Sequence, residues 1–502
     1  MNRFITTAAI CLALAGCDVD LASDMSEGAL LVPDGEGRDG KVLMLSPGSD
    51  SVIQINRADK AVSRIDVGNL PRTLERPEGS DVVYTLEPQD GTITRIGLDG
   101  IAVTQELGGP FNRLEWAPDG MQAVAVFDDS LGNVDINELG SLNPNAVALL
   151  TDDGETLSIR QYTLTFPPEQ VTFDVDSTKA LISTRARLHV LDLETLEERA
   201  IPFSQEDGVE RRPSLVAPSS DGTRALVAVQ GQSDLFVVSL DPVLIENVIG
   251  LTRAPSALAW SGDDATAAIA DNTSVVTFLD LESFETEALN VGHPVTTITV
   301  GGGVLEPFAL LYSATTTQPR LSRVSLSEPG APDAIDTWLL EDGIRSLYLE
   351  PGGTAAVVFH DGNSFGSTLG AQSLSLFSFT ERGPSRIFLD APATDLHFLE
   401  AGEILTSEAP HVMVVLELSG RIVRYNLWTY EQVVLDTYER PLAIGALPPG
   451  DQSGESTNRE LFVVHAQNGG LVSFLPPDAT EVPPGGWPAV SGLTGRDLLD
   501  RR

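Results

Sequence analysis

Several short phrases of this sequence place carboxylate, amide and imidazole side chains between apolar runs. Carboxylate and amide oxygens are the ligands that Ca²⁺ prefers, and histidine can bind a transition metal or transfer a proton. The candidate ligand-binding residues are Asp90, Asp128, Asp271, Asn272, His360, Asp361, Asn363 and His465. The competing interpretation is that Asp, Asn and Gly simply form the turns that such positions need.

A second oxygen-rich segment covers residues 128–145. Its weak candidate metal ligands are Asp129, Asn133, Asp135 and Asn137. A calcium loop that begins at Asn133 needs glycine at its sixth position and glutamate at its twelfth. Those positions hold Glu138 and Pro144 instead, so the pattern favours a solvated loop.

The sequence predicts no catalytic residue. Gly362–Gly366 matches the Gly-x-Ser-x-Gly pattern, but no helix is expected after it to form a nucleophile elbow. Gly35–Gly40 matches Gly-x-Gly-x-x-Gly, yet it opens a strand and carries acidic residues, which favours a flexible tether. The six histidines include no close pair with metal-ligand spacing.

The elements that must position these residues are short apolar runs, cut by Gly, Pro, Asp and Asn. Each unit has a phrase before a turn and then three strand-like runs. The third run begins near residues 52, 92, 146, 187, 235, 275, 321, 374, 422 and 471. The mean spacing of about 46.6 residues fits the ~40–50 residues of a four-stranded propeller blade.

We therefore predict an all-β chain, with one large β-propeller of four-stranded blades over residues 41–480 and a Pro/Gly-rich tail over 481–502. Stacking small sheets around an axis buries both of their apolar faces and leaves only short edges. The first and last units are incomplete and could combine into one blade, so we expect about nine blades, within a range of seven to ten. The candidate ligands would then surround one mouth of the central channel.

Two hairpin phrases carry a resemblance to known repeats. Leu188–Thr195 (LHVLDLET) and Val276–Ser283 (VTFLDLES), with the turn phrases upstream, resemble the bacterial YVTN and WD40-like β-propellers. The resemblance covers roughly residues 41–480 and concerns the fold more than the function. The Trp-Asp dipeptide of the eukaryotic class is missing, and Gly292-His293 does not recur.

The first residues have the form of an export signal. Arg3 precedes the apolar run Phe4–Ala15, which is too short to cross a bilayer, and Leu14-Ala15-Gly16-Cys17 follows. This resembles the lipobox of bacterial lipoproteins, which implies removal of residues 1–16 and acylation of Cys17. The alternative is an ordinary signal peptide with an incidental cysteine. Residues 17–40 are acidic and rich in glycine, and we expect a flexible tether there, which could hold one short strand at Ala29–Val32.

The charge balance limits the partners. Lys and Arg total 31 against 72 Asp and Glu, which gives a formal net charge of −41. Such a surface repels phosphate backbones, excludes nucleic acid and favours a basic protein or divalent cations. The two cysteines, Cys11 and Cys17, cannot form a disulfide framework or a thiolate zinc site.

Together these features predict a lipid-anchored protein of the bacterial inner or outer membrane that faces the periplasm or the cell surface. We expect a non-catalytic scaffold for an envelope protein or a surface polymer, as a monomer or within an envelope complex. No cofactor is required, and Ca²⁺ is the candidate ion that the oxygen ligands favour. The alternative is an enzyme, because YVTN-like propellers resemble lactonases and quinoprotein dehydrogenases, which implies a metal or cofactor at the channel mouth.

Overall fold

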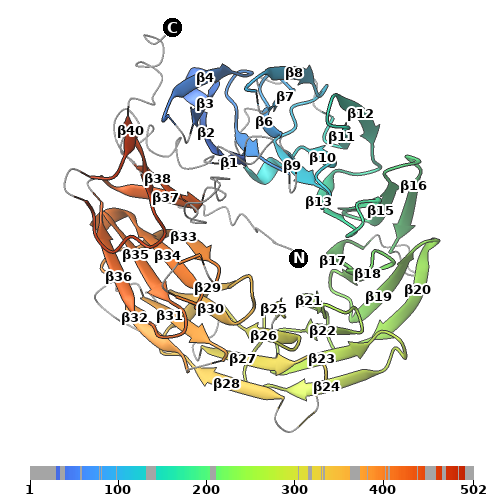
Figure 1. Cartoon of the computed structure of the whole chain (residues 1–502). Helices are drawn as coiled ribbons and strands as arrows, with labels where there is room; N and C mark the ends of the chain where they lie inside the picture. Colours follow the sequence, from blue (N-terminus) through green and yellow to red (C-terminus); the bar gives the residue numbers. More distant parts are fainter. Residues whose placement is uncertain are drawn as a thin grey trace.

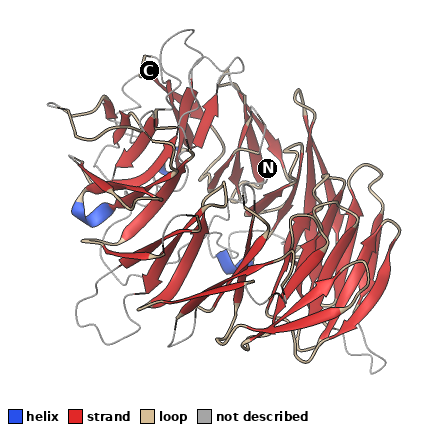
Figure 2. Ribbon diagram, turned by 60° about the horizontal axis from the view of Figure 1, so that its bottom comes forward, coloured by secondary structure: helices blue, strands red, loops and turns tan. Residues whose placement is uncertain are grey.

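Ten four-stranded antiparallel sheets follow one another around a central axis in the computed structural model of the chain (Figure 1). Strands account for almost all of its regular structure (Figure 2). The structure describes residues 30–33, 40–56, 59–77, 80, 82–97, 99–131, 143–203, 211–302, 305–314, 319–329, 331, 334–361, 373–380, 383–401, 403–404, 407–437, 439–446, 460–465, 471–483 and 486–491.

Each sheet is one blade, and it contains four strands that are consecutive in the chain. Blade 1 contains β1 (Leu30–Pro33), β2 (Gly40–Ser46), β3 (Ser51–Asn56) and β4 (Val62–Asp66). Blade 2 contains β5 (Thr73–Glu75), β6 (Val83–Glu87), β7 (Thr92–Ile96) and β8 (Ala102–Glu106). Blade 3 contains β9 (Arg113–Trp116), β10 (Gln122–Val126), β11 (Ala146–Asp152) and β12 (Leu157–Thr163). Blade 4 contains β13 (Pro168–Phe173), β14 (Lys179–Thr184), β15 (Arg187–Asp192) and β16 (Glu198–Pro202). Blade 5 contains β17 (Pro213–Pro218), β18 (Arg224–Val229), β19 (Asp234–Leu240) and β20 (Val243–Gly250).

Blades 6 to 10 repeat the arrangement. Blade 6 contains β21 (Ala257–Trp260), β22 (Thr266–Ala270), β23 (Val275–Asp280) and β24 (Thr286–Asn290). Blade 7 contains β25 (Thr297–Gly301), β26 (Phe308–Tyr312), β27 (Arg320–Ser325) and β28 (Ile335–Leu339). Blade 8 contains β29 (Gly343–Leu349), β30 (Ala355–Asp361), β31 (Ser373–Ser378) and β32 (Ser385–Phe388). Blade 9 contains β33 (Ala393–Leu399), β34 (His411–Leu416), β35 (Arg421–Asn426) and β36 (Gln432–Asp436). Blade 10 contains β37 (Pro441–Ala446), β38 (Leu461–His465), β39 (Leu471–Leu475) and β40 (Ala489–Ser491). Three single turns of 3₁₀ helix lie between strands: η2 (Pro47–Ser49), η3 (Asp129–Leu131) and η4 (Glu417–Ser419).

The predicted β-propeller of four-stranded blades is confirmed. It has ten blades rather than about nine, and ten is the upper limit of the expected range. The short strands β1 and β40 complete the first and last sheets, so the two terminal units form two separate blades. No blade combines strands from both ends of the chain. The strands of the ring extend from Leu30 to Ser491, and they include five residues of the expected tether, Leu30–Pro33 and Gly40, and three of the expected tail, Ala489–Ser491.

The meander within each blade divides its connections between two end faces. Successive strands are antiparallel, so the turns between strands 1 and 2 and between strands 3 and 4 lie at one end. The turns between strands 2 and 3 lie at the other end, together with the connections between blades. We call this second end the entry face, because the chain enters each blade there. The first strand of each blade lies nearest the channel and the fourth lies on the outside (Figure 1).

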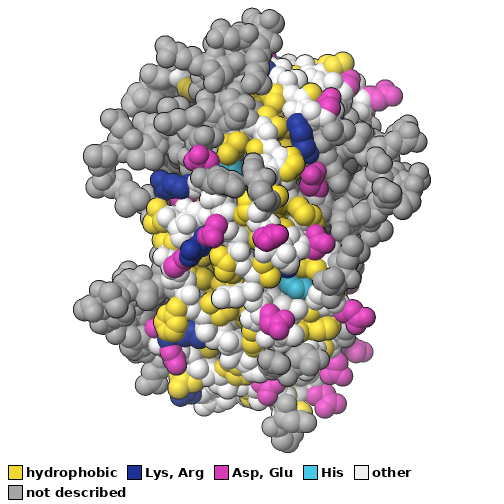
Figure 3. Space-filling view, turned by 60° about the vertical axis from the view of Figure 1, so that its left-hand side comes forward, with side chains coloured by type: hydrophobic (Ala, Val, Ile, Leu, Met, Phe, Trp, Pro, Cys, Tyr) yellow, Lys and Arg dark blue, Asp and Glu magenta, His cyan; other side chains and the backbone are white. Residues whose placement is uncertain are grey.

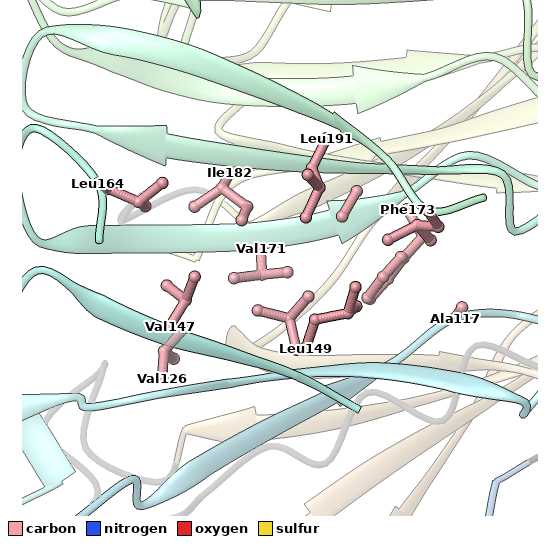
Figure 4. Close-up of a cluster of buried hydrophobic side chains, with 12 residues drawn as sticks. Ala117, Val126, Val147, Leu149, Leu164, Val171, Phe173, Ile182 and Leu191 are labelled. Atoms are coloured by element: carbon pink, nitrogen blue, oxygen red, sulfur yellow. The ribbon is translucent and has the colours of Figure 1, made fainter. Parts of the chain in front are cut away.

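The hydrophobic core consists of ten clusters, one between each pair of neighbouring blades. Figure 4 shows the cluster between blades 3 and 4, where Val147 and Leu149 pack against Val171 and Ile182. Alternate residues of a strand point to opposite faces of its sheet. Leu181, next to Ile182, accordingly belongs to the cluster between blades 4 and 5. Each blade thus depends on two neighbours to bury its apolar residues.

Blades 10 and 1 close the ring without exchanging a strand. Their cluster contains Val42, Met44, Ile53, Ile55, Phe462, Val464, Val472, Phe474 and Val490. The ammonium of Lys60 lies 3.6 Å from the centroid of the Phe474 ring and 3.4 Å from a carboxylate oxygen of Glu460. The two ends of the chain are therefore held by side-chain contacts across this seam.

Turns between the third and fourth strands reach back to the preceding blade. Lys60, Leu196, Phe284 and Tyr430 adopt left-handed backbone conformations in such turns, with φ between 58° and 63°. Leu196, Phe284 and Tyr430 then pack against the clusters shared with the preceding blades. Lys60 occupies the same position at the seam, so the closing contact uses the geometry of the other interfaces.

Among the described residues, no helix has the length and apolar character needed to cross a membrane.

Candidate functional site

The described candidate residues all follow the second strand of a blade. Asp90 lies after β6, Asp128 after β10, Asp271 and Asn272 after β22, and His360 and His465 lie at the ends of β30 and β38. They therefore share the entry face. They belong to blades 2, 3, 6, 8 and 10, so only blades 2 and 3 among these are neighbours.

His360 and His465 are buried within their own blades. Their Nε2 atoms lie 2.7 Å and 2.6 Å from the hydroxyls of Ser375 and Ser473 on the third strands. Each Nδ1 lies 3.2 Å from a backbone carbonyl oxygen, that of Gly343 for His360 and that of Glu439 for His465. A carbonyl only accepts hydrogen bonds, so Nδ1 carries the proton and Nε2 accepts from the serine. Burial lowers the pKa of both imidazoles, which are therefore neutral at pH 7.

A third histidine makes the same contact from a different place in the chain. His293 lies in the connection before blade 7, and its Nε2 is 2.8 Å from the Ser322 hydroxyl. Burial lowers its pKa as well. Ser322, Ser375 and Ser473 are each the third residue of a third strand. This position is therefore a recurring polar site inside the blades, and each of the three imidazoles contacts a third-strand serine there.

Asp90, Asp271 and Asn272 take part in local turn geometry. One Asp90 carboxylate oxygen accepts the backbone N–H of Asn69 at 3.0 Å. Asp271 accepts the backbone N–H of Thr273 at 3.0 Å and its hydroxyl at 2.5 Å. Asn272 has a φ of 65°, a conformation that asparagine tolerates better than most residues.

Asp128 forms an ion pair with the first strand of its blade. A guanidinium nitrogen of Arg113 lies 2.7 Å from its carboxylate, and Ser130 donates its backbone N–H and its hydroxyl. Partial burial raises the pKa of Asp128, but the hydrogen bonds from Ser130 and Arg113 outweigh burial and lower it overall. The carboxylate is thus ionised and already paired.

The remaining candidates are placed less fully. Asp129 begins η3 and is exposed. Asp361 ends β30, but its side chain lies outside the described residues. Cys17, Asn133, Asp135, Asn137 and Asn363 also lie outside them. Within the described ranges, no group of three or more His, Cys, Asp or Glu side chains has an arrangement that could hold a metal ion.

Sequence reasoning missed three carboxyl groups that the fold removes wholly or partly from solvent, of which Glu87 is buried and Glu75 and Asp395 are half-buried. Burial raises the pKa of Glu75 to about 8, that of Glu87 to about 7 and that of Asp395 to about 6. Glu75 and Asp395 lie on the first strands of blades 2 and 9, and Glu87 ends the second strand of blade 2. Their burial depends on the packing of neighbouring strands and blades, which no local phrase reveals.

Glu75 belongs to a polar layer between blades 2 and 3. The indole N–H of Trp116 donates to its carboxylate at 3.1 Å. The Trp116 ring packs on Tyr84, with ring centroids 4.5 Å apart, and the Tyr84 hydroxyl donates to Asp152. Arg95 completes the layer, because its Nε lies 2.7 Å from the same carboxylate of Asp152. These buried groups hold two blades together, and they leave little polar capacity for a ligand.

Glu87 has hydroxyl partners instead of a cation. Thr85 and Thr92 donate to its carboxylate, the latter at 3.0 Å. Burial raises its pKa more than these hydrogen bonds and that of Thr94 lower it. Thr94 is the third residue of its third strand, the position that serine holds in blades 7, 8 and 10. Glu87 thus takes in blade 2 the place that histidine takes in blades 8 and 10.

The charges of the two end faces differ strongly. Among the described residues, the turns between strands 1 and 2 and between strands 3 and 4 contain 25 Asp or Glu and only two cations, Arg76 and Lys60. We call this end the acidic face. The entry-face turns and connections contain 10 Asp or Glu and six arginines. These are Arg72, Arg185, Arg211, Arg212, Arg253 and Arg440.

The outer wall is mixed in character. On the side formed by the last blades, single cations lie beside acidic side chains, with apolar atoms between them (Figure 3). Among the described residues, most of the excess of acid in the turns and connections therefore lies at one end of the ring. Residue types alone could have revealed it once strands 1 to 4 of each unit were assigned.

Comparison of the chain with known proteins finds similarity among solved structures only. No protein-family model and no curated protein sequence matches it. Among solved structures, it is similar to the dihydro-heme d1 dehydrogenase NirN in complex with DHE, at 12 % identity and a TM-score of 0.47, over 72 % of this chain and 74 % of that one. It is also similar to the hydrazine synthase of Kuenenia stuttgartiensis, at 12 % identity and a TM-score of 0.35, over 63 % and 97 %. A chain of the mitotic checkpoint complex shares 12 % identity at a TM-score of 0.38, over 56 % and 82 %. Similarities this low carry no information about function.

Proposed function

We propose that this chain is a lipid-anchored scaffold of the bacterial envelope whose acidic face binds a basic protein. The observation that carries the proposal is the charge of that face, whose described turns contain 25 acidic residues and two cations. A surface of one sign attracts a partner of the other sign from a distance and rejects partners with the same charge. Ten packed clusters hold the acidic turns on a continuous ring.

Part of this charge is free for a partner. In the turn after β15, Asp192 uses one carboxylate oxygen to accept the backbone N–H groups of Glu194 and Thr195. Asp280 does the same for Glu282 and Ser283 after β23. The side chains of Glu194 and Glu282 are exposed, and neither forms an ion pair with a described residue. The aspartates thus shape the turns, and the glutamates beside them can meet lysine or arginine.

A pair of matched double variants tests the proposed acidic-face partner. Glu194→Gln/Glu282→Gln removes two charges from the acidic face. Glu106→Gln/Asp129→Asn removes two from the entry face, where Glu106 ends β8 and both carboxylates are exposed. Each protein, with Cys17 intact, is cross-linked in native envelopes, purified in detergent and quantified with its partners by mass spectrometry.

We expect one basic protein to be recovered with the wild type and several-fold less of it with the acidic-face variant. The entry-face variant should recover as much as the wild type, and added salt should weaken recovery in both. Equal losses from the two variants, or recovery of no specific protein, would contradict the proposal. The anchor is tested separately, since Cys17→Ser should move the protein from the membrane to the soluble fraction.

A further inference from the structure

The position of β1 determines where the preceding chain meets the ring. β1 (Leu30–Pro33) is the first strand of blade 1 and pairs only with β2, so it lies on the channel side of that blade (Figure 1). First strands run from the entry face to the acidic face. Leu30 therefore lies at the entry-face end of β1, and any tether from Cys17 joins the ring there.

The length of that tether favours a membrane on the same side. Twelve residues lie between Cys17 and Leu30, and a flexible chain of the resulting thirteen Cα-to-Cα steps has a root-mean-square extent of ~20 Å and a maximum of ~45 Å. The longest first strands have seven residues, so the channel wall extends over ~23 Å. A tether that led to the acidic face would have to cross this distance first, whereas one that leaves from the entry face would not.

The charge distribution favours the same orientation. Anionic lipids give a bilayer a negative surface potential that acts over a Debye length of ~8 Å. The acidic face would be repelled at that distance. The entry face, with 10 acidic residues and six arginines in its described turns and connections, meets far less repulsion.

The entry face also carries exposed apolar side chains in three consecutive blades. Leu339 ends β28, Phe388 ends β32 and Leu418 lies in η4, with exposed fractions of 70 %, 64 % and 63 %. The guanidinium of Arg386 lies 4.4 Å from the centroid of the Phe388 ring and pairs with Asp342. Leucine, phenylalanine and arginine are side chains that favour the boundary between headgroups and acyl chains.

From these three observations we infer that the entry face lies against an anionic lipid bilayer, with Leu339, Phe388 and Leu418 in contact with the lipid. The acidic face then points away from the membrane, toward the basic partner. This inference rests on the proposed function, because it takes the acyl group on Cys17 as the anchor. The most exposed cluster of apolar residues and the start of the tether occur on one face, and the largest excess of acid occurs on the other.

Depth-dependent fluorescence quenching tests this orientation. Leu418→Cys places one thiol on the entry face, Ile101→Cys places one on the acidic face, and Val248→Cys places one on the outer wall. Leu418 and Ile101 are matched, since each is 63 % exposed, and Val248 is 47 % exposed. The full-length acylated proteins are labelled with the fluorophore NBD and reconstituted into vesicles of phosphatidylethanolamine and phosphatidylglycerol that contain spin-labelled lipid.

We expect the label at position 418 to shift to the blue and to be quenched several-fold more than the labels at positions 101 and 248. Stronger quenching at 101 would place the acidic face on the membrane, and stronger quenching at 248 would place the ring on its edge. Either result, or equal quenching at all three positions, would overturn the inference. Mass spectrometry of the N-terminal peptide distinguishes failure of the proposed anchor from failure of the proposed orientation. Protein without an acyl group at Cys17 contradicts the anchor and the orientation together, whereas acylated protein with the wrong quenching pattern contradicts only the orientation.

Discussion

The interface between blades 2 and 3 and the seam between blades 10 and 1 have the same apolar layer but different polar groups. Between blades 2 and 3, Arg95, Tyr84 and Asp152 form a buried network, and Trp116 donates to Glu75. At the seam, Lys60 lies on the face of Phe474 and beside Glu460. The first pair of blades is also joined by continuous chain, whereas the described contacts across the seam are between side chains.

This difference distinguishes the apolar contacts common to every junction from the polar groups specific to one interface. An apolar layer is present at all ten junctions, including the seam. Buried ionisable groups add pH dependence and sensitivity to single substitutions, because an unpaired buried charge is costly. We therefore expect the seam to respond mainly to loss of volume, and the junction of blades 2 and 3 to respond to loss of a polar partner or to a change of pH.

The largest effect should follow from Phe474→Ala at the seam. Phe474 is 1 % exposed, and truncation of a buried phenylalanine lowers the free energy of unfolding by about 3–5 kcal/mol. Phe111→Ala at the junction of blades 2 and 3 is the matched control, since Phe111 is also 1 % exposed. Hydrogen exchange should accelerate in β2, β3, β38 and β39 with the seam variant only, because no chain crosses the seam. The same exchange pattern in both variants would show that the seam is not a separate point of opening.

Arg95→Met should lower the free energy of unfolding by about 3 kcal/mol, because it leaves the carboxylate of Asp152 buried without its cation. The side chain of Asp152 is 6 % exposed. The double variant Arg95→Met/Asp152→Leu removes both charges and should regain most of the loss, as measured by urea unfolding. If the double variant is as unstable as the single one, packing and not the charge pair accounts for the effect.

Glu75→Gln should remove a pH dependence from the same junction. Burial raises the pKa of Glu75 to about 8 from 4.5, so the folded protein keeps a proton that the unfolded chain releases. The contribution is complete below pH 4.5 and decreases as the pH rises toward 8. The variant should therefore match the wild type at pH 4 and exceed it in free energy of unfolding by about 1–2 kcal/mol at pH 8.5. Parallel stability curves across this range would argue against a protonated Glu75, and Glu106→Gln serves as the exposed control.

The smallest effect should follow from Lys60→Met. The variant keeps most of the aliphatic stem but loses the cation over Phe474 and the pair with Glu460, whose side chain is 26 % exposed. A loss of about 1 kcal/mol is expected from the midpoint of urea unfolding. Lys60→Arg keeps the charge and should retain most of the stability. Unchanged stability of the methionine variant would mean that the seam is held by its apolar cluster alone.

The repeat unit could be predicted closely from sequence. The third runs expected near residues 187, 275 and 471 begin at Arg187, Val275 and Leu471, and the other seven begin within one residue of their expected starts. These strands are buried on both faces, so their apolar runs stand out between turn residues. Fold class and blade length follow from such local signals.

The number of blades depended on the weakest strands. β1 has four residues and β40 has three, and both lie in segments rich in Gly, Pro and acidic residues. The apolar run at Ala29–Val32 indicated a short strand, but its pairing with β2 was needed to show that it completes a blade. β40 could not be recognised without β39, the strand to which it pairs. The buried role of His360 was hidden for the same reason, because Gly343 and Ser375 come from two other strands of the blade. The charge of an end face follows from the residue types in its turns and from the order of the strands, so the acidic face could have been predicted from the sequence.

The seam also has a consequence for the order in which the molecule forms. Lys60 and Glu460 are 400 residues apart, whereas the other nine junctions join consecutive blades. As the chain is synthesised from its N-terminus, those nine can assemble one after another from local contacts, which form quickly. Blade 1 must wait with Val42, Met44, Ile53 and Ile55 uncovered until the last strands emerge. A chaperone that recognises exposed apolar strands thus has the longest time to act on the first blade.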